Sequence, residues 1–232
     1  MKKSILFIFT ACFLFTTSCS DFLDEEHKTK YSSEYVFGTP EGLKLAVNAL
    51  YALQRYYAND TENATIFALE RGTDLAVTNG GTGNFYGIYD PNYLKPSASQ
   101  VGFMWRTMYQ IIGKANEIIA AAEDLEDTPS LRATVSEAKC FRAQSYFLLY
   151  RTFDRIWLNI QPTTAENVND PRDFHAASEK EVFDLIYEDL EYAITNLDWV
   201  SDEAGRFTQA AARHMKAKAA LWLKDWDTTL ES

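Results

Sequence analysis

The segment from Glu137 to Trp157, EAKCFRAQSYFLLYRTFDRIW, constrains the fold of this chain most strongly, because it is dense in aromatic residues and contains neither glycine nor proline. A stripe of its residues recurs three and four positions apart, the spacing that places side chains on one side of an α-helix. The stripe consists of Phe141, Ser145, Leu148, Leu149 and Thr152, and Phe147, Tyr150 and Phe153 widen it. An apolar face this wide has to be covered by several helices. We therefore expect a central helix, beginning after Thr128-Pro129 and ending near Arg155.

Residues typical of helix N-termini predict two further helices, one before and one after the central helix in the sequence. Thr39 precedes Pro40 and Glu41, which is the preferred order of an N-cap, a first helical residue and an acidic side chain near the helix dipole. Ser178 and Glu181 have the spacing of a capping box, so a helix is expected over 179–197. The predicted buried faces are Leu43, Val47, Leu50, Leu53 and Tyr57 in the first helix, and Val182, Ile186, Leu190, Ala193 and Leu197 in the second.

Three more segments have helical character. Residues 105–122 repeat apolar side chains at Trp105, Met108, Ile112, Ala115, Ile119 and Ala122, with Ile111, Ile118 and Leu125 in an adjacent row. Asn116 falls inside this helix, where bonding to a nearby loop is expected more often than bonding to a ligand. A short helix is expected around Thr65 to Glu70, and an alanine-rich helix after Gly205-Arg206-Phe207-Thr208, with a partner helix from Trp226. The alanine-rich helix has small residues that allow a neighbouring helix to approach closely, namely Ala212, Ala217, Ala219 and Ala220.

The segment from Gly72 to Val101 is predicted to be a long loop, since glycine, proline, asparagine and serine interrupt any helical pattern there. Tyr86, Tyr89 and Tyr93 lie within it, with asparagines such as Asn84 between them. Aromatic rings can stack on the C–H faces of sugars while amides bond the hydroxyl groups, so these four residues are candidate ligand-binding residues. The alternative interpretation is that the rings anchor the loop to the helices or to a partner protein.

The N-terminus is predicted to be an export signal. Lys2 and Lys3 precede an apolar run from Ile5 to Phe15 that is too short to span a bilayer. The following Thr16-Thr17-Ser18-Cys19 resembles a lipoprotein cleavage box, which predicts a signal peptide over 1–18 and lipid on Cys19. Residues 19–38 contain an acidic cluster and are interpreted as a tether before a helical domain over 39–232. Cys140 then remains as one cysteine on an apolar helix, where a small buried side chain is the expected role.

Charge and motif searches favour binding over catalysis. The formal net charge of −11 argues against a nucleic acid partner. The three histidines, His27, His175 and His214, lack the spacing of a metal site, and neither a phosphate-binding glycine loop nor a nucleophile elbow occurs. Glu188, Asp189 and Glu191 are interpreted as a solvated polar face. We therefore expect no enzyme, no metal and no cofactor, although paired carboxylates from distant positions would leave an extracellular glycoside hydrolase open.

Several of these motifs resemble the SusD/RagB family of outer-membrane lipoproteins. The similar elements are E-A-x-x-F-R-A-x-x-Y-F from Glu137, the W-x-x-x-Y-x-x-I-x-x-x-N pattern from Trp105, the Gly205-Arg206-Phe207-Thr208 entry into a helix and the acidic run after Cys19. The chain departs from the family after the central helix. The usual Tyr-Gly-x-x-Pro-Leu run is replaced there by Arg151-Thr152-Phe153-Asp154-Arg155-Ile156-Trp157-Leu158, which lacks the glycine and the proline.

The resemblance implies an all-α, irregular tetratricopeptide-like helical bundle with long loops. It also implies a surface-exposed lipoprotein of the outer membrane that binds a starch-like glycan or oligosaccharide and passes it to a TonB-dependent, SusC-like transporter. A helical scaffold that binds only protein is the main alternative. Family members run further than Ser232, so the chain is interpreted as the N-terminal portion of such a protein.

Overall fold

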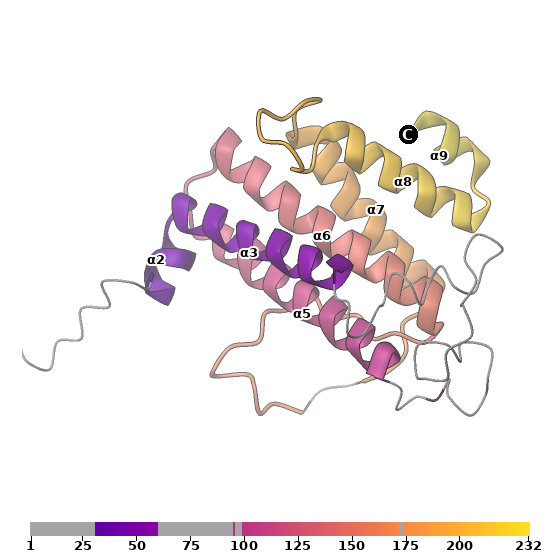
Figure 1. Ribbon diagram of the computed structural model, residues 1–232, viewed down its shortest axis with the longest axis horizontal. Coiled ribbons are helices and arrows are strands. Elements are labelled where there is room, and N and C mark those ends of the chain that lie inside the picture. Colours follow the sequence, from indigo (N-terminus) through magenta and orange to yellow (C-terminus); the bar gives the residue numbers. More distant parts are fainter. Residues whose placement is uncertain (1–30, 60–94, 96–98, 172–173) are drawn as a thin grey trace, which may run out of the picture. The chain divides into compact units, whose positions relative to one another are not determined.

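Every regular element in the described part of the chain is an α-helix, which confirms the all-α class (Figure 1). The computed structural model describes residues 31–59, 95, 99–171 and 174–232. The helix expected near Thr65 and most of the loop expected over 72–101 lie outside these residues. The helices are α2 (Ser33–Gly38), α3 (Pro40–Asn59), α5 (Ser99–Ala122), α6 (Pro129–Phe153), α7 (Glu179–Asn196), α8 (Gln209–Leu223) and α9 (Trp226–Glu231).

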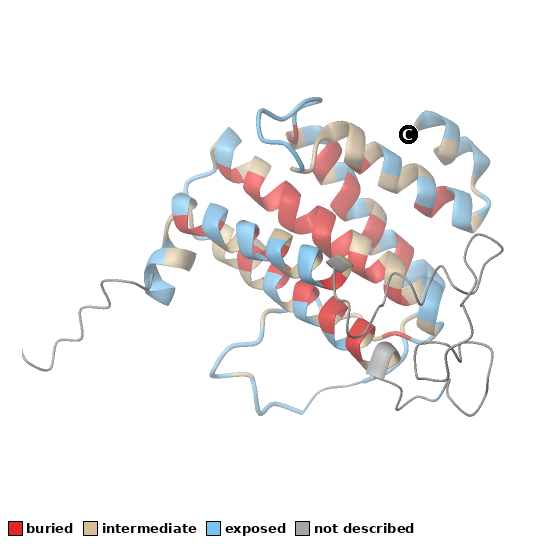
Figure 2. Ribbon diagram, in the orientation of Figure 1, coloured by how far each residue is buried: buried red, intermediate tan, exposed pale blue. Residues whose placement is uncertain are grey.

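Helix α6 is the central helix, as predicted from its wide apolar face. It packs against α3, α5, α7 and α8, and buried residues follow it along most of its length (Figure 2). Phe141, Ser145 and Leu149 are buried, but Thr152 is exposed and bonds its own helix at the Leu148 carbonyl, so its place in the buried stripe was wrong. The helix ends at Phe153, and Asp154 follows with a φ of 61°.

The predicted helix starts are confirmed by their capping bonds. The hydroxyl oxygens of Thr39, Thr128 and Ser178 each accept the backbone N–H three residues on, at 3.0, 3.2 and 3.3 Å. Glu181 completes the capping box by accepting the Ser178 N–H at 2.8 Å. These bonds satisfy N–H groups that have no partner inside the helix, which is why the sequence marks each start clearly.

The outer helices bury the faces that their periodicity predicts. The expected buried residues of α7 are all buried, and those of α3 are buried apart from the half-buried Leu53. Helix α2 is a difference, since it lies within the segment interpreted as a tether. Gly42 of α3 permits α2 to pack closely against α3, because an added Cβ at this position would lie 2.2 Å from the Tyr35 carbonyl oxygen.

Helices α8 and α9 form the last pair in the described chain. Ala212, Ala219 and Ala220 are fully buried, which confirms close packing of these positions. Lys224 adopts the left-handed conformation, with a φ of 59°, and turns the chain into α9. None of the helices over the described residues combines the length and the apolar character needed to cross a bilayer.

Candidate functional site

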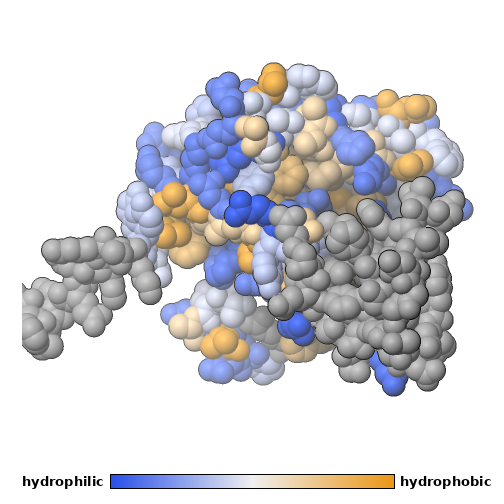
Figure 3. All heavy atoms as spheres, in the orientation of Figure 1, coloured by the Kyte–Doolittle hydropathy of each residue, from blue (hydrophilic) through white to orange (hydrophobic). Residues whose placement is uncertain are grey.

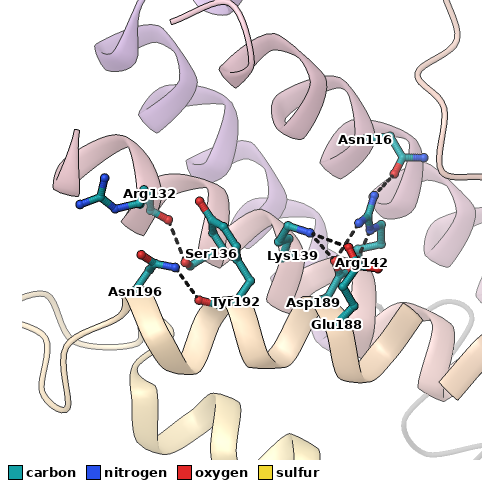
Figure 4. A network of polar contacts seen from close by, with 9 residues as sticks. All are labelled: Asn116, Arg132, Ser136, Lys139, Arg142, Glu188, Asp189, Tyr192 and Asn196. Atoms are coloured by element: carbon teal, nitrogen blue, oxygen red, sulfur yellow. Dashed lines mark hydrogen bonds and ion pairs between the residues drawn. The ribbon is translucent and has the colours of Figure 1, made fainter. Parts of the chain in front are cut away.

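A buried ion-pair network joins α6 to α7 (Figure 4). Asp189 on α7 is fully buried, and its carboxylate accepts hydrogen bonds from Lys139 Nζ at 2.8 Å and from Arg142 Nε and Nη2 at 2.7 Å each. The interpretation of Asp189 as part of a solvated face was therefore wrong, whereas Glu188 and Glu191 are exposed as expected. The physical reason is that both cations project from the buried side of α6 and neutralise the carboxylate away from water.

The network continues into the segment that follows α6. Arg142 Nη1 donates to Asn116 Oδ1 at 2.8 Å, and Asn116 Nδ2 donates to the Asn159 carbonyl at 2.7 Å. This confirms the expectation that Asn116 bonds a loop. Burial alone would lower the pKa of Arg142, but its bonds to Asp189 outweigh burial and raise that pKa. The network thus holds three helices and a loop in register, a structural role.

A second polar cluster links α3, α6 and the connection between α7 and α8. Tyr51 donates its hydroxyl proton to the Glu137 carboxylate and accepts the Phe207 N–H at 2.7 Å. Arg206 lies with Nε 3.4 Å from Glu137 and with its guanidinium carbon 4.9 Å from the centre of the Tyr51 ring. Burial raises the pKa of Glu137, although Tyr51 and Arg206 act in the opposite direction. Burial thus favours the protonated form of this carboxylate, whereas the Tyr51 hydrogen bond and the Arg206 charge favour its charged form.

A polar pocket of about 260 Å³ opens beside this second cluster. Its lining includes Lys44, Thr134, Glu137, Asp202 and Arg206, so charges of both signs and hydroxyl groups face one hollow. Such a lining can hydrogen-bond a polar ligand, but the Lys44–Glu203 and Arg206–Glu203 pairs already occupy several of these groups.

An aromatic series runs from α5 to the segment before α7. Trp105 and Tyr109 lie 4.8 Å apart between ring centres, Tyr109 stacks on Trp157 at 6.4 Å, and Trp157 meets Phe174 at 4.8 Å. The Tyr109 hydroxyl accepts the Trp157 N–H at 2.9 Å and donates to its carbonyl at 2.8 Å. Phe174, at the end of the series, is 70% exposed. Trp105, Tyr109 and Trp157 are half-buried, so the series reaches the surface at Phe174 and forms an aromatic candidate that was not predicted from the sequence.

The residues predicted as site residues lie outside the described part of the chain. Cys19, proposed to carry lipid, and the loop residues Tyr86, Tyr89, Tyr93 and Asn84 all fall there, so their roles stay predictions. Cys140 is fully buried, as expected, and burial raises the pKa of its thiol. Within the described residues no group of three or more histidine, cysteine, aspartate and glutamate side chains could hold a metal ion.

The chain belongs to the SusD-like family. The family model described as starch-binding associating with outer membrane matches residues 21–221. Among relatives, a SusD-like protein of Bacteroides ovatus is 28% identical over 240 residues, which cover 98% of this chain and 40% of that relative. This family assignment confirms the resemblance drawn from the helix motifs.

Solved structures agree with the fold. A laminarin-binding SusD-like protein superposes with a TM-score of 0.71 and 26% identity, covering 82% of this chain and 41% of that one. A structure solved with a xylogluco-oligosaccharide superposes with a TM-score of 0.62 and 24% identity, covering 77% of this chain and 34% of that one. The tetratricopeptide-like helical fold is thereby confirmed, and the chain spans about two fifths of the length of the first protein and about a third of the second.

Proposed function

We propose that this chain is part of a cell-surface glycan-binding lipoprotein. The observation that carries the proposal is the family match over residues 21–221, supported by the superposition on a laminarin-binding relative. The composition also suits glycan binding, since aromatic residues that can stack on sugars are numerous. The protein is not proposed to be an enzyme.

The proposed ligand contacts are the loop tyrosines Tyr86, Tyr89 and Tyr93 with Asn84. A tyrosine ring presents a flat apolar face to the C–H groups of a pyranose, and an asparagine amide can both donate to and accept from the hydroxyl groups at the ring edge. Several such rings along one loop would bind successive sugar units. The ligand is therefore expected to be an oligosaccharide or polysaccharide of several units.

The proposed location is the outside of the outer membrane, with lipid on Cys19 as the anchor and the acidic segment after it as the tether. From this position the protein would pass its glycan to a TonB-dependent, SusC-like transporter. The family description, which places the family at the outer membrane, supports this location.

Native gel electrophoresis through polysaccharides tests the binding. We expect the migration of the chain to be slowed by at least one polysaccharide among laminarin, xyloglucan and starch, and the change of Tyr86, Tyr89 and Tyr93 to Ala to remove most of this retardation. Tyr56→Ala is the matched control, because Tyr56 is 59% exposed on helix α3 and is not a proposed ligand contact. Retardation that survives the triple change would remove these three residues from the proposal.

Cell fractionation tests the anchor. Cys19→Ala should move the protein from the membrane fraction to the soluble fraction, whereas Cys140→Ala should leave its location unchanged. If Cys19→Ala stays in the membrane fraction, the anchor is not a lipid on that residue.

Protein contact is a second candidate function, and exposed apolar side chains on the last two helices favour it. Leu221, Trp222, Trp226 and Leu230 are 51%, 49%, 59% and 86% exposed, and apolar surface is visible over this end of the molecule (Figure 3). Exposed apolar patches often mark interfaces between proteins. A chain that binds no glycan but forms a stable complex through this patch would favour a scaffold.

A further inference from the structure

An open pocket of about 390 Å³ lies at the end of the bundle where α5 ends and α6 begins. Its walls are mostly apolar and come from three helices, namely Ile119 and Ala122 of α5, Leu131, Val135 and Lys139 of α6, and Tyr192 of α7. The volume is in the range of roughly 300–1,000 Å³ that is usual for small-molecule sites. The pocket does not share residues with the proposed glycan contacts.

The charges beside this pocket do not balance. Lys139 and Arg142 are buried cations that share the single carboxylate of Asp189. The other buried acid among the described residues is Glu137, which is already engaged by Tyr51 and Arg206. The buried network therefore carries one positive charge in excess. A buried charge is costly unless it is fully neutralised, so this excess favours an anion.

The nearest additional groups compensate this charge only in part. The carboxylate of Glu188 lies 3.9 Å from Lys139 Nζ, but its side chain is 73% exposed and water screens it. The Tyr192 ring lies with its centre 5.2 Å from Lys139 Nζ, a cation–π contact that stabilises the ammonium without neutralising it. At the rim, Asp127 is paired with Arg132 at 2.9 Å, and Glu123 is exposed.

We propose that this pocket binds a small monocarboxylate with an apolar body, with the carboxylate at Lys139 and the body against the aliphatic walls. An ammonium group has three N–H donors, and Asp189 takes one of them at 2.8 Å. A ligand carboxylate would accept another and neutralise the excess charge. The aliphatic walls favour an aliphatic or aromatic body over a sugar, whose hydroxyl groups would lose their bonds to water there.

Benzoate is the probe, and the uncharged benzamide of the same shape is its control. Titration of the purified chain at low salt, followed by ligand-observed NMR, should give saturable binding of benzoate and at least about tenfold weaker binding of benzamide. Equal binding of the two compounds, or no saturable binding of benzoate, would overturn the proposal.

Lys139→Met is the informative variant, because Arg142 remains to neutralise Asp189 and the buried network becomes balanced. We expect benzoate affinity to fall about ten- to hundredfold, which is the loss of one charge-assisted hydrogen bond. Ala122→Phe fills the pocket without changing any charge and should also abolish binding. Circular dichroism confirms the fold of both variants, and a folded Ala122→Phe variant that binds benzoate as the wild type does would place the site elsewhere and overturn the proposal.

Discussion

Changing Asp189 to asparagine should destabilise the protein more than its conservative chemistry suggests. The asparagine keeps the volume and one carbonyl oxygen, but it leaves Lys139 and Arg142 as buried cations without a buried counter-charge. Removing one member of a buried ion pair typically costs about 3–5 kcal/mol, and Asp189 has no exposed surface through which water could compensate. We therefore expect a loss of about that size.

Glu188→Gln is the matched control for this prediction. Glu188 is the adjacent acidic residue on α7 and also faces Lys139, but at 3.9 Å and with 73% of its side chain exposed. An exposed pair of this kind is worth less than about 1 kcal/mol. Both variants should be measured by urea unfolding, with tryptophan fluorescence and circular dichroism as independent probes of one transition.

Replacing Arg142 and replacing Lys139 should lower the free energy of unfolding by different amounts. Arg142→Met removes two bonds to Asp189 and the bond to Asn116, whereas Lys139→Met removes one bond and leaves a balanced pair. We expect the free energy of unfolding to fall more for the first variant than for the second. A loss for Asp189→Asn that is no larger than that for Glu188→Gln would refute the reasoning for the whole network.

Three further predictions concern other polar groups. Burial raises the pKa of folded Glu137 above its ordinary value of 4.5, so its contribution to stability relative to Glu137→Gln is complete below pH 4.5 and is lost as the pH rises through the folded pKa. Urea unfolding of both proteins from pH 4 to 7 measures the difference in unfolding free energy. A difference that does not change with pH would contradict the prediction. Ser178→Ala should cost about 1 kcal/mol of unfolding free energy by removing the α7 cap, and an unchanged urea midpoint would argue against that role. Tyr146→Phe should cost about 1–3 kcal/mol, since its hydroxyl bonds both the N–H and the carbonyl of Asn159 at 2.8 and 2.9 Å; a thermal midpoint equal to that of the wild type would refute this.

The helices could be predicted from the sequence because local chemistry determines where they begin. Thr128, Ser178 and Thr208 each precede a periodic segment and each accept the N–H three residues on. The wide apolar face of α6 likewise indicated a central position, since several neighbouring helices are needed to cover it. Helix α2 was missed because its six residues are too short for a periodic pattern.

The burial of Asp189 was not predicted, because its charge was taken to indicate an exposed residue although its position in the helix faces inward. Asp189 lies three residues after Ile186 and four before Ala193, both on the buried face of α7, so the helical spacing did place it inward. What the sequence could not provide was the pairing of α7 with α6, which brings Lys139 and Arg142 to the same place from about 50 residues away. Pairing between distant segments depends on tertiary packing and not on local pattern.

For the candidate binding residues, too, the sequence indicated the class of protein but not the contacts between distant segments. Aromatic content and the absence of catalytic motifs favoured a binding protein, and the family assignment agrees with the class. The aromatic series from Trp105 to Phe174 was not predicted, because it depends on Tyr109 bonding the backbone of Trp157, 48 residues further along the chain. The choice of sugar depends on side-chain geometry in the ligand site, which no local sequence pattern specifies.

Isothermal titration calorimetry with defined oligosaccharides tests the central claim most directly. The titrations should use laminarin and xyloglucan oligosaccharides on the lipid-free chain and on a full-length protein that includes any sequence following Ser232. The account predicts saturable binding of at least one oligosaccharide, weakened at least about tenfold when Tyr86, Tyr89 and Tyr93 are changed to Ala but not by Tyr56→Ala. Absence of heat with every glycan for the full-length protein would contradict a glycan-binding function.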